Sequence, residues 1–442
     1  MPDGISRRAR SAGRRPWPWL CLLAVLLLLP TTAALADDSA NQQPPETAPT
    51  TAPLTMAQAV AMATAASDPE AVRFAARARA LDNQAVADAQ LPDPMITAQV
   101  AGVPTDSFSL DRDGMTQPLR LGLRQEFPAG RTLAVRGRQR RAEAQAQRAR
   151  SDEAVRRIAL DTRQAWLELA WQQRAVGILE ESRTRIKQQI ESLQSRFATG
   201  RLNAQSLLRS ELELSLLDDR IAEHRRMADQ ARAALTRYIG SEAFRRLPES
   251  LPEFALDSTK LRVLEQRLVD HPAVRARQAM IEAADEGIEL ARQAYKPKWA
   301  IEAGYGLRLE DPDLASIGVS LSVPLFTDKR QDKQHQAAIQ RSRAAQFERD
   351  TVLRNLREQL DQALADWRRY RERQTLYEQV VGQRAEETVE ASVTTYANGQ
   401  TDFAELIRSQ LAALDTQIKQ VELTALAGKA WARVTYLVGE SS

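Results

Sequence analysis

The chain has 442 residues, enough for two or three domains, and its 61 Lys and Arg against 58 Asp and Glu give a formal net charge of +3. Aromatic residues make up only 5% of it, and Ala, Arg, Gln, Leu and Glu are frequent. This composition is typical of long helices and coiled coils rather than of a compact α/β enzyme.

The first 36 residues have the pattern of a secretory signal peptide. An apolar run extends from Trp19 to Leu29, and Ala34-Leu35-Ala36 is a small-x-small cleavage site. A basic region precedes the run, with Arg7, Arg8, Arg10, Arg14 and Arg15. The alternative is an uncleaved membrane anchor, although the run is short for a spanning helix, which needs about 20 residues.

Cleavage would remove these five arginines and leave acidic and basic residues nearly balanced, so the positive net charge does not support nucleic-acid binding. It would also remove Cys21, the only cysteine. We therefore expect no disulfide and no Cys-based metal site in the mature chain. No Cys stands at the cleavage point, so we expect no N-terminal lipid, and no later segment is apolar enough for a transmembrane helix.

Residues 37–53 are rich in Pro, Thr, Gln and Ala, which predicts a disordered linker. The pattern from Leu54 to about Gln90 is helical, with a break at Ser67-Asp68-Pro69 that suits a helix N-cap. The second half repeats this break at Asp270-His271-Pro272, and both copies continue with Ala-Val-Arg.

Each half then changes to a period of two, which predicts strands. In residues 95–127 the apolar positions are Ile96, Ala98, Val100, Leu119, Leu121 and Leu123; in residues 299–323 they are Trp299, Ile301, Ala303, Tyr305, Leu307, Ile317, Val319 and Leu321. Each half thus carries one hairpin. Strands of about this length with one apolar and one polar face suit a transmembrane β-barrel. The alternative is an ordinary hairpin with one buried face.

Each hairpin ends at a proline, Pro128 or Pro324, and a long proline-free stretch follows. The apolar residues there have the three-four spacing of coiled coils, for example Val155, Ile158, Thr162, Ala165 and Leu169, and Leu353, Leu356, Leu360, Ala363 and Trp367. Unbroken helices over residues 131–197 and 329–396 would each be about 100 Å long. Such helices must pack side by side.

Each long helix ends at a turn, and the two turns match at an offset of 199 residues. Phe197-Ala198-Thr199-Gly200 leads to Leu207, and Tyr396-Ala397-Asn398-Gly399 leads to Leu406. Gly suits a helix C-cap, and Asn203 and Asp402 suit the N-cap of a returning helix. The predicted parts are a signal peptide at 1–36, the linker at 37–53, a first repeat at 54–240 with its tip turn at 198–203, a mid-rod linker at 241–260, and a second repeat at 261–439 with its tip turn at 397–402.

This duplicated order of helix, hairpin, long helix, turn and helix resembles the TolC-type outer-membrane efflux channel family. The residues that carry the resemblance are the two turns, Leu91-Pro92-Asp93-Pro94 before a strand, and Val323-Pro324-Leu325-Phe326 after one. It covers about residues 54–439. Leu91–Pro94 and the following Gly102-x-Pro104 look like the heavy-metal branch, whose channels work beside cation-exporting pumps.

The resemblance implies a mainly α fold with a small membrane β part. Three chains would form a long helical coiled-coil tunnel in the periplasm and a twelve-stranded β-barrel in the outer membrane, with four strands from each chain. It implies a passive exit duct of a tripartite system, possible cargo being heavy-metal cations, with a periplasmic adaptor and an inner-membrane pump as partners. No cofactor is expected.

By the same resemblance, the tip turns receive the adaptor, with Gly200, Arg201, Leu202, Gly399, Gln400 and Thr401 as docking candidates. Both glycines can also serve only as helix caps. Glu405 stands where family members carry an acidic ring at the tunnel mouth, and Tyr396 is a second gate candidate. Arg408, three residues after Glu405, departs from a double acidic ring and is able to pair with Glu405 instead.

No catalytic constellation and no phosphate-binding glycine loop is present in the sequence. The three histidines are far apart; we expect His224 and His335 to be solvated and His271 to lie in a helix cap. No metal site is predicted. The alternative function is a periplasmic coiled-coil adaptor, a class with one helical hairpin and a lipoyl-like β domain rather than a repeated strand hairpin.

Overall fold

The computed structural model describes residues 52–106, 108, 116–198, 204–256, 261–309 and 311–439. The predicted signal peptide and nearly all of the predicted linker at 37–53 lie outside these residues. Residues 52–442 form one compact unit.

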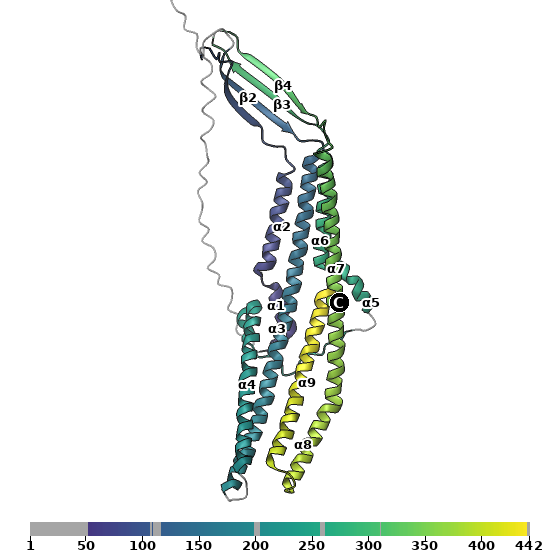
Figure 1. The fold of residues 1–442 in the computed structure, drawn as a ribbon. Coiled ribbons are helices and arrows are strands. Elements are labelled where there is room, and N and C mark those ends of the chain that lie inside the picture. The colour runs from purple at the N-terminus through teal and green to yellow at the C-terminus, as the bar shows by residue number, and fades with distance from the viewer. Residues whose placement is uncertain are drawn as a thin grey trace, which may run out of the picture. The chain divides into compact units, whose positions relative to one another are not determined.

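The described chain repeats the order helix, strand hairpin, long helix and helix (Figure 1). The first half contains α1 (Met56–Ala65), α2 (Pro69–Ala87), β1 (Met95–Ala101), β2 (Gln117–Phe127), α3 (Thr132–Ala198) and α4 (Ala204–Ile239). The second half contains α6 (Pro272–Gln293), β3 (Lys298–Leu307), β4 (Leu314–Ser322), α7 (Gln331–Leu376), α8 (Gly382–Ala397) and α9 (Phe403–Val438). Short elements join the halves: η1 (Gly240–Phe244), α5 (Leu261–Arg267) and η3 (Leu268–Asp270).

The repeated break is a helix N-cap in both halves. The Asp68 side chain accepts a hydrogen bond from the backbone N–H of Glu70 at 2.8 Å, and Pro69 opens α2. In the second half, His271 Nδ1 accepts from the N–H of Ala273 at 3.2 Å, and Pro272 opens α6. Each cap satisfies a backbone donor that the first helical turn leaves without a partner.

The long helix α3 is the centre of the helical part. It packs against α2 and α6 near the sheet, and against α4 and α9 further from it. A buried core of α3 and α4 side chains surrounds Trp166, whose ring N–H donates to the Leu54 carbonyl at 3.0 Å. On the far side α7 packs against α6 and α9, and α8 packs mainly against α9. The helices therefore form a layer in the order α2, α3, α6, α7 near the sheet and α4, α3, α9, α8 away from it.

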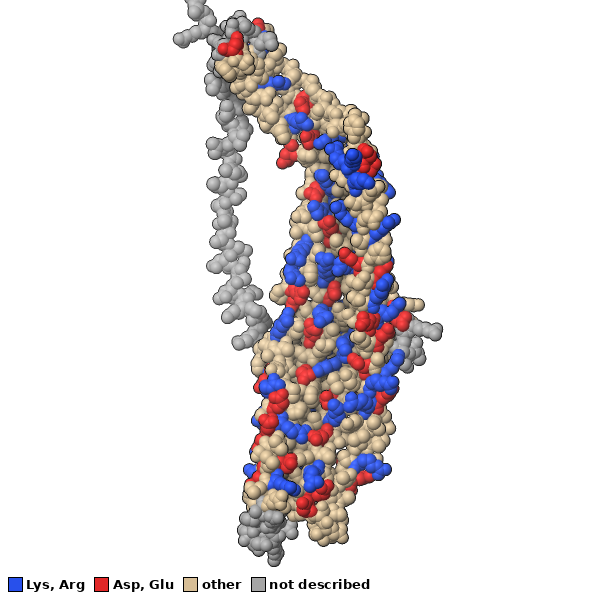
Figure 2. Space-filling model, viewed as in Figure 1, with Lys and Arg blue, Asp and Glu red and all other residues tan. Residues whose placement is uncertain are grey.

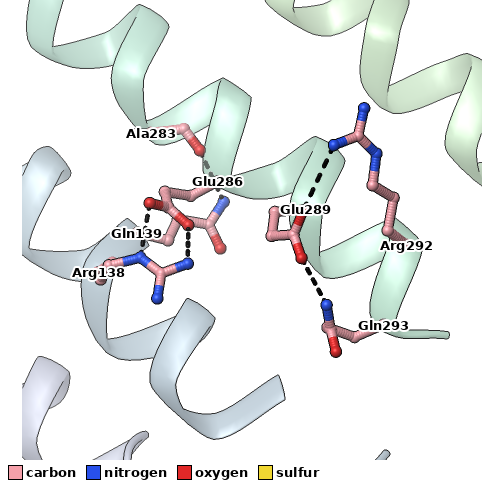
Figure 3. Close-up of polar contacts among 7 residues, drawn as sticks. All are labelled: Arg138, Gln139, Ala283, Glu286, Glu289, Arg292 and Gln293. Carbon is pink, nitrogen blue, oxygen red and sulfur yellow. Dashed lines mark hydrogen bonds and ion pairs between the residues drawn. The ribbon is translucent and has the colours of Figure 1, made fainter. Parts of the chain in front are cut away.

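A bidentate ion pair joins α3 to α6 and hence the first half to the second (Figure 3). The Arg138 guanidinium donates to both carboxylate oxygens of Glu286 at 2.8 Å. The next residue, Gln139, donates to the carbonyl of Ala283, which lies about one turn before Glu286 on α6, at 3.3 Å. The hydrogen bond to Glu286 raises the pKa of Arg138 further above its usual value, so the guanidinium keeps its charge in this pair.

The two hairpins join into one antiparallel sheet with the order β1-β2-β3-β4. In its register, Leu121 lies opposite Tyr305 and Gly122 lies opposite Gly304. Because side chains alternate along a strand, one sheet face carries the apolar positions predicted above and the other carries the polar ones.

The apolar face of the sheet is exposed. Ile96 retains 76% of its accessible surface, Leu121 45% and Ile317 85%. The alternative of an ordinary hairpin with a buried apolar face does not fit these values. In Figure 2 the sheet shows few charged side chains, whereas the helices show many of both signs. Within the described residues, none of the helices has the length and apolar character needed to cross a membrane.

Candidate functional site

The turn after α8 is built by Gly399. Its φ of +68° is in the left-handed region, which a glycine adopts without steric cost. The N–H of Gln400 donates to the Thr395 carbonyl at 2.9 Å and the N–H of Gly399 donates to the Tyr396 carbonyl at 3.0 Å, so carbonyls at the helix end are satisfied. A Cβ on residue 399 would meet no atom within 4 Å, so the turn presents open backbone to solvent.

The returning helix α9 begins at a strong cap. The Asp402 side chain accepts from the N–H of Glu405 at 2.9 Å. Behind it, Phe403 is buried, and its ring meets the edge of Tyr396 with the ring centres 5.5 Å apart. Phe403, Leu406 and Ile407 belong to a core shared with α3 and α4. Tyr396 therefore fixes the turn against this core from α8.

Glu405 and Arg408 point away from the core and form an ion pair. Both are exposed, with 49% and 60% of their side-chain surface accessible. The pairing that the spacing allows is thus present in this chain. A single exposed pair of this kind contributes less than about 1 kcal/mol to stability, so the Glu405 carboxylate is readily released to other partners.

The first turn lies outside the described residues, and Gly200, Arg201, Leu202 and Asn203 with it. The helices that lead into and out of it, α3 and α4, are joined by the ion pair of Arg183 with Asp218. A second ion pair, between Arg220 of α4 and Asp415 of α9, connects the two helical hairpins.

Two of the three histidines, His224 and His335, differ from the sequence-based expectation. His224 is not simply solvated: its Nδ1 lies 2.6 Å from the Gln172 side-chain oxygen, its ring meets Trp171 edge-on, and burial lowers its pKa. His335 packs edge-on against Tyr295, and its Nε2 is buried without a hydrogen-bond partner in the described chain. The heptad pattern missed both because the neighbours that cover these rings, Trp171 and Gln172 for His224 and Tyr295 for His335, are far from them in the sequence. Among the described residues, no three His, Cys, Asp or Glu side chains gather into a possible metal site.

The polar face of the sheet is the other candidate surface. Arg124 of β2 donates to Glu302 of β3 at 2.6 Å and to Glu126 at 3.2 Å. One row further along the strands the residues are small: Thr97, Gly122, Gly304 and Ser316 face one another across all four strands. A Cβ on Gly304 would lie 2.6 Å from the Ser316 hydroxyl, so a larger residue does not fit at this position without displacing that hydroxyl. The side chains of this row therefore extend only a short way from the sheet.

The second half of the chain matches a known family. Residues 263–440 fit the family model described as "Outer membrane efflux protein". A comparison with curated protein sequences finds no match.

Solved structures share the fold over 87% of the chain. The outer membrane protein VceC from Vibrio cholerae has a TM-score of 0.73 at 18% identity, with 96% of its chain covered. A membrane protein from Pseudomonas aeruginosa has a TM-score of 0.74 at 16% identity, with 92% covered. The Campylobacter jejuni CmeC outer membrane channel has a TM-score of 0.72 at 14% identity, with 85% covered.

The predicted fold class, with long helices and four strands from two repeats, is therefore confirmed. The repeated hairpins also differ from the single helical hairpin and lipoyl-like domain expected of a periplasmic adaptor. Over residues 263–440 the chain is therefore similar to the outer membrane efflux protein family, and over most of its length it shares the fold of solved outer-membrane channels.

Proposed function

We propose that this protein is the outer-membrane exit duct of a tripartite efflux system, a passive channel that carries substrate from a pump and its adaptor across the periplasm and the outer membrane. The observation that carries the proposal is a sheet whose apolar face is exposed and whose two edge strands, β1 and β4, each have a strand partner on one side only within the described residues. In lipid, each unpaired backbone group costs several kcal/mol, as an order of magnitude. Such a sheet must close with further copies.

The helical layer, like the sheet, has two different edges that can meet between neighbouring copies. Its free edges are α2 and α4 from the first half, on the side of β1, and α7 and α8 from the second half, on the side of β4. One edge of a copy therefore meets the other edge of the next copy. A head-to-tail contact of this kind makes a closed ring when the rotation closes. By resemblance to the family, the ring holds three copies and twelve strands.

In such a ring the apolar face meets lipid and the polar face lines the passage. Arg124, Glu126 and Glu302 neutralise one another in part, and the small residues beside them leave the passage wide. A passive duct needs this combination, because solutes must enter and leave without strong binding.

Membrane extraction and imaging test the duct. We expect the protein to require detergent for extraction from the outer membrane and to give three-fold particles with a hollow helical part. A monomer that is soluble without detergent contradicts the proposal.

We assign adaptor docking to the two turns, with Gly399, Gln400 and Thr401 at one and Gly200, Arg201 and Leu202 at the other. The open backbone at Gly399 supports this. Gly399→Trp should impair export while ring assembly is retained. Gly399→Asn is the matched control, because Asn tolerates positive φ and keeps the turn. Loss of the ring in Gly399→Trp, but not in Gly399→Asn, would make the turn a helix cap alone.

We assign the control of the mouth to Glu405, with Tyr396 positioning the turn beside it. Three Glu405 carboxylates around a ring attract cations, and Arg408 weakens that field while it is paired. Arg408→Gln should therefore raise the preference for cations in bilayer conductance measurements, and Glu405→Gln should lower it. If Arg408→Gln and Glu405→Gln have the same ion selectivity, Glu405 does not control the mouth.

The prediction of metal cations as cargo rests on the resemblance of Leu91–Pro94 and Gly102-x-Pro104 to the heavy-metal branch. Growth of a deletion strain with and without the channel, on a series of divalent and monovalent metals and on drugs, tests it. Sensitivity to drugs alone contradicts it.

A further inference from the structure

The two long helices of the repeats differ at one place. α3 is α-helical throughout Thr132–Ala198, whereas a π-turn, η4 (Tyr377–Val381), interrupts its counterpart between α7 and α8. At the offset of the two tip glycines, Tyr377 corresponds to Ile178 in the first half, and Gly382 corresponds to Arg183. The heptad spacing of the apolar residues does not indicate where the second helix is interrupted, and only the structure shows this break.

Two residues specify the π-turn. The Tyr377 carbonyl accepts from the N–H of Gly382, five residues on, and also from Gln420 Nε2 of α9 at 2.9 Å. A Cβ on residue 382 would lie 2.6 Å from Gln420 Nε2 and 2.9 Å from the Tyr377 carbonyl oxygen, so a side chain there would displace one of them. Glycine is therefore required at residue 382, where the side-chain amide of Gln420 approaches the helix.

The first half lacks both features. Arg183 replaces the glycine and pairs with Asp218 of α4 instead, and Ile221 replaces the glutamine and is buried in the core. An isoleucine cannot donate to a backbone carbonyl. The difference between the halves is therefore built into the sequence at matched positions.

Beyond the π-turn, α8 is held on one side only. It has no buried residue, whereas α9 buries Phe403, Leu406 and Ile407 against α3 and α4. A groove of about 360 Å³ separates α8 from α3. Its walls include Ser182, Arg185 and Ile186 of α3 and Glu386, Val389 and Glu390 of α8. The helix thus has room on the side of α3 and little packing to oppose movement.

We propose that η4 is a joint about which α8, between η4 and its anchored end at Tyr396, moves relative to α3, and that Gln420 is the positioning residue that holds the joint. A π-turn breaks the regular hydrogen-bond ladder, and helices bend at such places. The joint rests on the proposed function, because only in a duct does the swing of α8 change the width of the mouth.

The test measures the distance between α8 and α3 across the groove. Spin labels on Arg185→Cys and Glu390→Cys face each other there, and the only cysteine of the chain, Cys21, lies within the predicted signal peptide. Pulsed electron–electron double resonance on the detergent-solubilised full-length protein reports the distribution of distances between the two spin labels of each chain. Labelled protein diluted with unlabelled protein removes the distances between copies.

Three variants in this background decide the matter. Gln420→Leu removes the donor to Tyr377 and should broaden the distribution. Gln417→Leu, one turn away on α9, is the matched control and should leave it unchanged, because the Gln417 side chain makes no hydrogen bond to the described residues. Deletion of Glu378 removes the extra residue of the π-turn, restores a continuous α-helix with both faces in register, and should narrow the distribution.

The proposal requires both changes. It is overturned if Gln420→Leu has the same distribution as Gln417→Leu, or if the deletion leaves the width of the parent. Imaging of the same samples distinguishes the failure of the joint from the failure of the proposed function. Three-fold particles whose spin-label distances do not change in the variants contradict the joint but not the duct. Absence of the ring contradicts the duct.

Discussion

At the scale of single residues, His271 is the most sharply placed titratable group in the helical part. It is fully buried at the start of α6, its ring meets Tyr436 edge-on, and Arg156 of α3 and Arg275 of α6 lie near it. Burial, and then the two arginines, lower the pKa of His271 from 6.5 to about 4. The neutral ring is required, because Nδ1 must accept from the N–H of Ala273.

This environment predicts acid sensitivity. Between pH 6.5 and 4, His271 is protonated in the unfolded chain but neutral in the folded chain. The contribution of His271 to the free energy of unfolding is therefore full above pH 6.5, and about 3 kcal/mol of it is lost as the pH falls to 4. His271→Asn keeps an acceptor for the cap and should lose this part of the pH dependence. Thermal unfolding at pH 7 and pH 4.5, followed by circular dichroism, measures it. An equal fall in Tm for both proteins contradicts the assignment.

Gly428 of α9 is a second residue with a clear steric role. A Cβ there would lie 2.6 Å from the buried ring of Phe254. Gly428→Ala should destabilise the fold by about 1–3 kcal/mol, because the ring must move out of a packed core. Gly177→Ala on α3 is the control: its Cβ meets nothing within 4 Å, and it should be neutral or stabilising by up to about 1 kcal/mol. Thermal unfolding of the two variants side by side separates the effects.

At the scale of elements, the strands follow their sequence closely. The alternation around Leu121 and Ile317 predicts which side chains share a face, and the register places them as predicted. What the pattern left open was whether the apolar face is covered. It is exposed because, in the part of the chain that the structure describes, no helix packs on it: the helices extend away from the sheet.

The faces of β4 give a matched test of the membrane. Ile317→Lys puts a charge on the apolar face and should reduce assembly of the barrel, at a cost of about 2–4 kcal/mol if the residue lies near the bilayer midplane. Ser316→Lys puts the same charge on the polar face one residue away and should be tolerated. The fraction of heat-modifiable assembled protein on a gel measures both. Equal assembly would mean that the apolar face does not meet lipid.

At the scale of the whole molecule, the exposed edges carry complementary apolar stripes. On α4, Leu208, Leu212 and Leu216 follow one another at every fourth residue and are half or more exposed. On the opposite edge, Val380 and Val393 are exposed as well. Leu208 comes eight residues after the first tip glycine and Val393 six before the second, so both lie about 10 Å from their turns at 1.5 Å per residue.

The ring therefore predicts a specific crosslink. Leu208→Cys combined with Val393→Cys should form disulfides between neighbouring copies, because α4 of one copy meets α8 of the next. A covalent trimer should be seen on a non-reducing gel. Each single variant is a control and should remain a monomer under the same conditions. A double variant that forms only dimers would indicate a two-fold contact instead of a ring.

The sequence by itself determined the duplicated order of elements, the two hairpins with their faces, the helix caps at Asp68 and Asp402, and the resemblance to a channel family. These features depend on local periodicity and on residues with fixed backbone preferences, which a linear pattern records. The tertiary structure alone decided the order of helices around α3, the burial of His224 and His271, and the π-turn. Each of these depends on a partner far along the chain, and Gln420 acts on Tyr377 only because α9 packs beside α7.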